Sequence, residues 1–176
     1  GRVKDALGSA VNVAQHYVKE HERGIIGDAY DIANNIQHDQ TLFDAEKHVR
    51  PAQFFSKLNS LTKDRGLQAS YIVDGHGKIL ASTKQQFLKD PKPPSATDIS
   101  QARAGSIVVD AAPEGGTVTA LIQMQALNDA YLLVVRLVDP QVFGYYRRTV
   151  DAVSEYNRLD QNRLEVQLVF AALYAV

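Results

Sequence analysis

The chain has 176 residues, of which 45% are hydrophobic, and its 19 basic and 20 acidic residues leave a formal net charge of -1 at pH 7. This length and composition predict a folded domain with a sizeable core. The balanced charge, without a basic cluster, excludes nucleic-acid binding, and the absence of cysteine excludes disulfides, cysteine-ligated metals and thiol nucleophiles.

Residues 3 to 36 carry apolar side chains at helical spacing and predict a long N-terminal helix, in which two glycines permit a bend. Val11, Val18, Ile25 and Ile32 fall seven residues apart, the interval that keeps one seam facing a partner. The same stripe would serve to pack the helix against the chain's own sheet. Between these two uses, the pattern favours a homodimer.

A second helix is expected to begin at Pro51 and to end at Gly66, because proline suits the first helical position and glycine the end. The pattern then changes to that of strands, which are predicted at residues 69–74, 78–82, 106–110, 117–125 and 130–138. The turn Gly75-His76-Gly77 joins the first two strands as a hairpin.

Three prolines within residues 84–95 exclude regular structure there and predict a loop or lid. Ser95 or Thr97 is then expected to cap a short helix that Gly105 ends. Asp139-Pro140 opens a last helix that runs toward the apolar residues 166–176. We expect residues 166–176 to be the start of a membrane helix. They are too few to cross a bilayer alone, because a membrane-spanning helix needs about 20 residues. The alternative is a C-terminal helix that docks on its own domain.

The resulting fold class is α+β, with a five-stranded antiparallel sheet flanked by long N- and C-terminal helices. This order resembles the layout of an extracytoplasmic PAS-like (Cache-type) sensor domain, which would occupy residues 1–165.

Five segments carry motifs that, in this order and spacing, indicate a narrower resemblance: 17–21, 69–81, 101–105, 129–140 and 152–159. On these motifs, the chain resembles the periplasmic region of NtrY-type nitrogen-regulation sensor histidine kinases. The resemblance implies a periplasmic domain of an inner-membrane protein, held by flanking membrane helices. It also implies a kinase core outside this chain.

Three polar side chains lie in otherwise apolar strands, where each must find a partner: Tyr71, Tyr131 and Arg136. We interpret them as candidate ligand-binding residues, and Arg136 could hold a ligand carboxylate through two parallel hydrogen bonds. The alternative is a structural ion pair between Arg136 and an acid such as Asp129 or Asp139. The amino-acid motif of some Cache sensors requires a tryptophan, which this chain lacks.

No set of residues predicts a catalytic centre, a metal site or a cofactor. His16 and Glu20 share a helical face, but further ligands are missing nearby. Ser70, Asp74 and His76 lie close in sequence, yet positions on one hairpin alternate between its faces. No ATP-binding motif is present, so the chain itself is not expected to be an enzyme.

Two functions remain open. The first is a signal-sensing module that binds a small molecule between the sheet and the proline loop and relays occupancy through its terminal helices. The second is a ligand-free dimerisation, spacer or protein-interaction module of a membrane receptor. A closed pocket behind Tyr71 and Arg136 would distinguish the first from the second.

Overall fold

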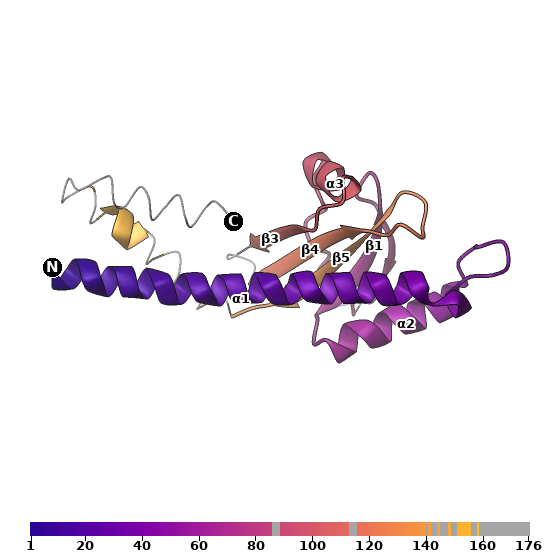
Figure 1. Ribbon diagram of the computed structural model, residues 1–176, viewed down its shortest axis with the longest axis horizontal. Helices are drawn as coiled ribbons and strands as arrows, with labels where there is room; N and C mark the ends of the chain where they lie inside the picture. The colour runs from indigo at the N-terminus through magenta and orange to yellow at the C-terminus, as the bar shows by residue number, and fades with distance from the viewer. Residues whose placement is uncertain are drawn as a thin grey trace. The chain divides into compact units, whose positions relative to one another are not determined.

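The computed structural model describes residues 1–85, 89–112, 116–139, 141, 144, 148, 151–155 and 158, and within these ranges it confirms an α+β fold (Figure 1). The helices are α1 (Arg2–His38), the 3-10 helix η1 (Gln40–Leu42), α2 (Pro51–Asp64) and α3 (Ala96–Arg103). The strands are β1 (Ala69–Asp74), β2 (Ile79–Ser82), β3 (Val108–Ala112), β4 (Thr117–Gln123) and β5 (Ala130–Leu137).

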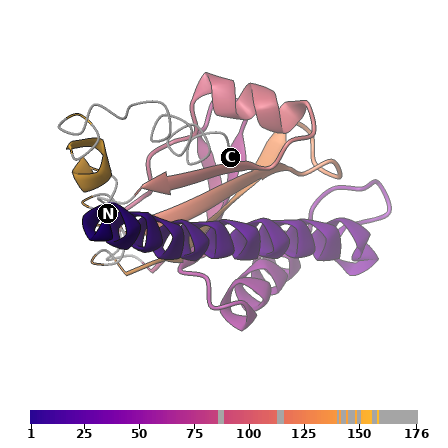
Figure 2. The ribbon, with the colours of Figure 1, turned by 60° about the vertical axis from the view of Figure 1, so that its left-hand side comes forward.

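The five strands form one antiparallel sheet in the order β2-β1-β5-β4-β3. The last strand in sequence therefore lies at the centre, between β1 and β4. In β5, every residue from Ala130 to Val135 is buried, as expected for a central strand covered on both faces. The sheet lies between α3 on one side and the helices α1 and α2 on the other (Figure 2).

The face of the sheet toward α3 holds a compact apolar core. Ile99 and Ala102 of α3 pack there on alternate residues of β1 and β5, of which Tyr71 and Leu133 are direct neighbours across the strands. Because side chains alternate along a strand, the residues between them point to the opposite face.

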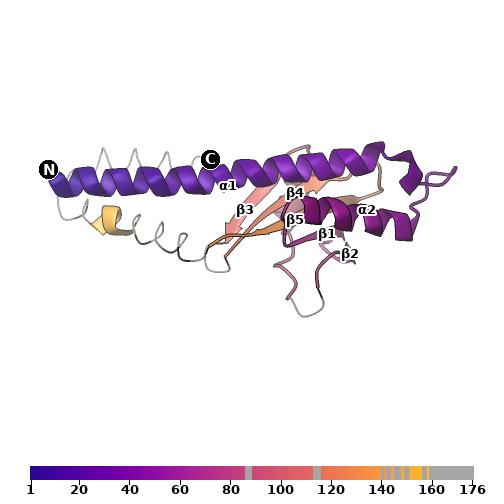
Figure 3. The same cartoon turned by 90° about the horizontal axis from the view of Figure 1, so that it is seen from below.

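That opposite face is closed by α2 and by the part of α1 that follows residue 21. In this part of α1, Ile25 and Ile32 are fully buried, so these two residues of the predicted seam are covered by the chain itself. One polar contact lies in this core: the Thr62 hydroxyl of α2 lies 2.7 Å from the Ser70 hydroxyl of β1. Figure 3 shows α2 beside this half of α1.

The chain divides into two compact units. The larger contains residues 22–112 and 117–137 and holds the whole sheet. The smaller contains residues 1–21, 113–116 and 138–176; in it, Val11 is buried and packs in one small cluster with Val153 and Leu7.

Short-range interactions fix the bounds of α3. Ser95 and Asp98 form a reciprocal capping box at its start, as the predicted cap at Ser95 requires. At its end, Gly105 adopts a φ of 100°, and the Ser106 amide reaches back to the Gln101 carbonyl at 3.1 Å. Because this turn still uses Ser106, β3 starts at Val108, two residues later than predicted.

The predicted C-terminal helix is described only in part. Residues 151–155 are helical, and the Asp139 carboxylate accepts a hydrogen bond from the Gln141 amide at 2.8 Å. Most of the predicted helix after Asp139 and the whole apolar segment 166–176 lie outside the described residues. No helix among the described residues combines the length and the apolar character that crossing a membrane requires.

Candidate functional site

The three predicted ligand-binding residues do not meet in one pocket. Tyr71 and Tyr131 belong to the core under α3, where they are 2% and 0% exposed. Arg136 is five residues from Tyr131 on the same strand, so it faces the other side of the sheet. Tyr71 and Arg136 therefore do not line one common pocket.

Arg136 makes an ion pair and hydrogen bond with Asp28 of α1. The side chains of the two residues are 21% and 19% exposed, so the pair is largely shielded from water. Gly24, one helical turn before Asp28, lets the guanidinium lie against the helix, since a Cβ there would come within 2.8 Å of the Arg136 Nη1 atom. The structural pair predicted as the alternative exists, but its acid is Asp28 and not Asp129 or Asp139.

A second arginine extends this ion pair into a small network. Arg65, which follows α2, places its Nε atom 4.0 Å from Asp28 Oδ1 and its Nη2 atom 3.8 Å from Asp31 Oδ2. Burial raises the pKa of Asp28, and the positive charges of Arg136 and Arg65 only partly oppose that rise. The network joins α1, the end of α2 and β5.

Tyr131 has a structural set of partners. Its hydroxyl lies 3.1 Å from Arg103 Nε and 3.2 Å from Asp129 Oδ1, and Arg103 also reaches that carboxylate at 3.3 Å. The hydrogen bonds to Tyr131 and Asp129 raise the pKa of Arg103. Glycine at position 75 leaves room for the Asp129 carboxylate, since a Cβ there would come within 2.3 Å of Asp129 Oδ2 and the carboxylate would have to move. The three polar groups thus fasten α3 to the start of β5.

Tyr71, on the face of the sheet toward α3, lies near the proline segment, by which we mean residues 89–95. Burial raises the pKa of its hydroxyl, and the nearby Asp90 carboxylate adds to that rise, whereas a hydrogen bond with Ser82 opposes it. Asp90 in turn forms an ion pair with Lys84 at 2.9 Å. Tyr71 therefore lies at the base of the segment that connects β2 with α3.

A cavity of about 130 Å³ lies between this connecting segment and the sheet. Its roof is formed by residues 92–95, and Asp98 of α3 adds to one wall. Its floor is made of side chains from the three strands β3, β4 and β5: Val108, Asp110, Thr119, Leu121 and Leu133. Leu133 pairs directly with Tyr71 across the strands, so the cavity adjoins one of the predicted ligand-binding residues.

The roof is held by close backbone packing. A Cβ at Gly77 would lie 3.3 Å from the Pro94 carbonyl oxygen, a tight contact, so glycine at this position favours close packing of the segment on the hairpin turn. Gly77 also adopts a φ of 80°, which a side chain would disfavour. The capping box at Ser95 fixes the other end of the roof.

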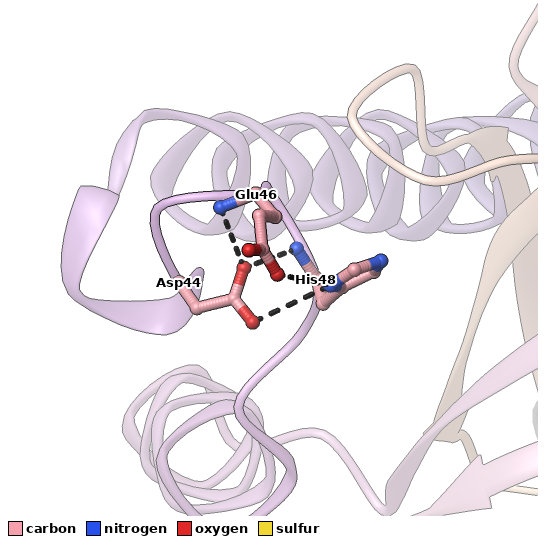
Figure 4. A group of neighbouring side chains, drawn as sticks. All are labelled: Asp44, Glu46 and His48. Carbon is pink, nitrogen blue, oxygen red and sulfur yellow. Dashed lines mark hydrogen bonds and ion pairs between the residues drawn. The ribbon is translucent and has the colours of Figure 1, made fainter.

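An exposed group of Asp44, Glu46 and His48 has the donor atoms of a metal site (Figure 4). The Asp44 carboxylate, however, accepts hydrogen bonds from the backbone amides of Glu46 and His48 at 2.9 and 2.8 Å. These bonds, foremost that of His48, lower the pKa of Asp44. The Asp44 carboxylate therefore stabilises the turn between η1 and α2, and this role explains why the three side chains lie close together.

The comparison with protein families decides the identity of the chain. The model of the NtrY N-terminal region matches residues 1–176. The chain belongs to this family. The sequence motifs predict this membership, and the family match confirms it. In this member, the NtrY N-terminal region has a central antiparallel sheet and the helices α1 to α3.

Curated relatives are named NtrY or NtrY-like. The nitrogen regulation protein NtrY of Azorhizobium caulinodans is 26% identical over 175 residues, which are 99% of this chain and 22% of that protein. Putative NtrY-like sensor histidine kinases of Rickettsia conorii and Rickettsia prowazekii are each 26% identical over 174 residues, 98% of this chain and 28% of theirs. The chain thus spans about a quarter of the length of these relatives.

Among solved structures, one titled "MglB with tetrameric arrangement" aligns with 65% of this chain and 93% of its own, at 18% identity. Its TM-score is 0.34, which is too low to indicate a shared fold.

Proposed function

We propose that this chain is the periplasmic, PAS-like (Cache-type) sensor domain of a two-component sensor histidine kinase that acts in nitrogen regulation. Membership in the NtrY N-terminal region family supports this proposal, as do the names of the relatives. The order of elements supports the PAS-like assignment: two helices, two strands, a short helix and three strands.

The signal enters, in this proposal, through the cavity between residues 92–95 and the sheet. The observation that carries it is this cavity on the α3 face, roofed by the proline segment and floored by three strands. Its volume of about 130 Å³ is below the roughly 300 to 1,000 Å³ of drug-sized ligand sites, so the ligand is a small molecule of few atoms. Lys92, Asp98 and Asp110 line it and would favour a polar or charged ligand.

Ligand binding would be relayed by β5. Leu133 of this strand lines the cavity, and three residues later Arg136 is paired with Asp28 on α1. A shift of β5 on binding would therefore act on α1 through the ion pair, and on the residues after Leu137 through the chain itself. Such a shift requires that the ligand bind the two conformations with different affinity.

A pair of identical substitutions on β3 tests the cavity. Val108 lines it, whereas Val109 is on the other face of the strand and is also half-buried. We expect native mass spectrometry to detect a small molecule bound to the wild type and to the Val109→Phe variant, but not to Val108→Phe, whose ring fills the cavity. Loss of the molecule from both variants, or its absence from the wild type, would contradict the proposal.

The kinase activity of the full protein is proposed to reside outside this chain. The chain is thus expected neither to bind nor to hydrolyse ATP. Isothermal titration of the 176-residue chain with ATP and magnesium tests this expectation, and saturable binding at micromolar concentration would contradict it.

The alternative function, dimerisation or spacing without a ligand, has one observation in its favour. Val3 and Val13 on the first part of α1 are 57% and 69% exposed. A homodimer through this part of α1 would cover them. Sedimentation equilibrium of the wild type and of a Val3→Ser, Val13→Ser variant tests it: the alternative requires that the wild type dimerise more tightly than the variant.

A further inference from the structure

A groove larger than the roofed cavity runs along α1. Its volume is about 650 Å³, within the range of roughly 300 to 1,000 Å³ in which small-molecule sites occur. Its walls are the second half of α1, the segment that follows α3, and the end of β4 with the turn behind it. It shares no lining residue with the cavity under the proline segment.

The lining of this groove carries no Asp, Glu, Lys or Arg, although such residues make up 22% of the chain. A charged ligand would lose its hydration there without gaining an ionic partner, which is costly. An uncharged ligand has no such cost. The groove therefore offers no carboxylate, Lys or Arg side chain to pair with a charged ligand.

Polar groups that both donate and accept hydrogen bonds replace the charges. Side-chain amides enter from α1 and from the end of β4, and hydroxyls from α1 and from the segment after α3. These groups belong to Tyr30, Asn34, Gln37, His38, Ser106 and Gln123.

Two of these groups have a defined hydrogen-bonding state. His38 Nδ1 lies 2.8 Å from the Asn34 carbonyl oxygen, and because a carbonyl only accepts, Nδ1 carries the proton. The Nε2 atom of a neutral His38 is then an acceptor. The Gln37 Oε1 atom accepts a hydrogen bond from the Ala126 amide at 3.3 Å, so the amide group of Gln37 offers its nitrogen as a donor.

Between these polar groups, the groove has apolar surface from Ile107 and Ile122, which are both half-buried. We propose that it is a second ligand site, one that takes an uncharged small molecule with several hydroxyl or amide groups and a short apolar face. This chemistry is shared by sugars and by neutral peptide fragments. The site goes beyond the proposed function, because the sensing cavity on the α3 face does not depend on it.

Thermal unfolding of the 176-residue chain with a panel of probes tests the site. The neutral probes are glucose, sucrose and N-acetyl-alanine methylamide, and the charged probes are acetate, phosphate and methylammonium. A ligand that binds only the folded state raises the melting temperature in a saturable manner. Comparing glucose and sucrose with N-acetyl-alanine methylamide shows whether the site prefers sugars or neutral peptide fragments.

Two neighbouring asparagines of α1 supply a matched control. Asn34 lines the groove, whereas Asn35 is exposed outside it and bonds the Asp31 carbonyl at 2.7 Å. We expect a neutral probe to shift the wild type and Asn35→Leu alike, and to bind Asn34→Leu up to about tenfold more weakly for each hydrogen bond lost. Ser106→Phe, which fills the groove from the other wall, should abolish the shift.

Each other outcome overturns the proposal. If no neutral probe shifts the wild type, the groove is not a site for this class. If charged probes produce shifts equal to those of neutral probes, the groove does not prefer uncharged ligands. If the shift persists in both Asn34→Leu and Ser106→Phe, the probe binds elsewhere. If a probe loses its shift in Val108→Phe but keeps it in Asn34→Leu and Ser106→Phe, the probe binds the roofed cavity. That outcome would support the proposed function and reject the second site.

Discussion

Arg136 on the central strand β5 is paired with Asp28 on α1, and this ion pair fastens the sheet to the long helix. Its two side chains are about four-fifths shielded from water. In a partly buried pair, removal of one partner leaves the other charge desolvated without compensation, whereas removal of both does not. We therefore expect the pair to have a measurable coupling energy.

A double-mutant cycle measures this coupling. We expect Asp28→Ala and Arg136→Ala each to lower the free energy of unfolding by about 1 to 3 kcal/mol, as for hydrogen bonds to charged groups. The double variant should lose at least about 1 kcal/mol less than the sum of the two, since the uncompensated charge is then absent. Urea unfolding followed by circular dichroism gives all four values.

The neighbouring pair of Asp31 and Arg65 serves as the control. The two groups are 3.8 Å apart, and the Asp31 side chain is 57% exposed, so water and salt screen their attraction. The same cycle on Asp31→Ala and Arg65→Ala should give a coupling below about 0.5 kcal/mol. Equal couplings in the two cycles would show that burial does not distinguish the pairs.

Two glycines of α1 differ in what surrounds them, and this difference predicts opposite effects of the same substitution. A Cβ at Gly24 would come within 2.8 Å of Arg136 Nη1, whereas at Gly27 nothing lies within 4 Å. Gly27→Ala should stabilise the protein by about 0.5 to 1 kcal/mol through helix propensity. Gly24→Ala gains the same propensity but displaces the guanidinium, so its net effect should be a loss.

The readout for the glycines is again the midpoint of urea unfolding. Introducing Gly24→Ala into Arg136→Ala removes the clash, and there it should stabilise as Gly27→Ala does. A stabilising Gly24→Ala in the wild-type chain would mean that the guanidinium does not depend on the missing Cβ.

The sequence predicts the elements well where local patterns decide them. The apolar spacing of α1, the cap at Ser95 and the glycines at positions 66, 77 and 105 all have local physical causes, and the structure has them as predicted. β3 starts two residues later than its apolar pattern predicts, because the turn that ends α3 extends to Ser106 and a pattern of apolar residues does not reveal such a turn.

The partner of Arg136 depends instead on the tertiary fold. Asp28 is 108 residues away in sequence, and the prediction considered only acids near Arg136 in the chain. A signal was present, because Asp28 is three residues after Ile25 and four before Ile32 and so shares their buried helical face. An acid on such a face requires a partner. The opposite facing of Tyr131 and Arg136 also follows from their odd spacing on one strand.

Acid should destabilise the protein partly through the hairpin turn. The Asp74 carboxylate accepts hydrogen bonds from the amides of Lys78 and His76 at 2.9 and 2.8 Å, and these lower its pKa below the ordinary 3.8. The folded state thus binds this proton more weakly than the unfolded state. The stabilisation by Asp74 is therefore present above pH 3.8 and is lost as the pH falls through the lowered pKa.

Asp74→Asn tests this contribution, because the amide oxygen still accepts hydrogen bonds but does not titrate. Urea midpoints measured near neutral pH and in steps below pH 3.8 should fall less steeply for the variant than for the wild type. Asp28 acts in the opposite direction: its pKa is raised, so its protonation favours the folded state as the pH falls toward 3.8. Asp28→Asn should accordingly make the decline steeper, and parallel curves for all three proteins would contradict both assignments.

Tyr131 is expected to be a structural residue, in contrast to the ligand-binding role that the sequence suggested. Its ring is fully buried, and its hydroxyl bridges Arg103 and Asp129, neither of which lines the roofed cavity. Tyr131→Phe keeps the ring and removes only the hydroxyl. Because the side chains of Arg103 and Asp129 are 55% and 50% exposed, water can replace the lost bonds, and the cost should be about 1 kcal/mol. The molecule that co-purifies with the wild type should still be detected on this variant by native mass spectrometry, and its loss from a variant of unchanged stability would restore Tyr131 to the ligand site.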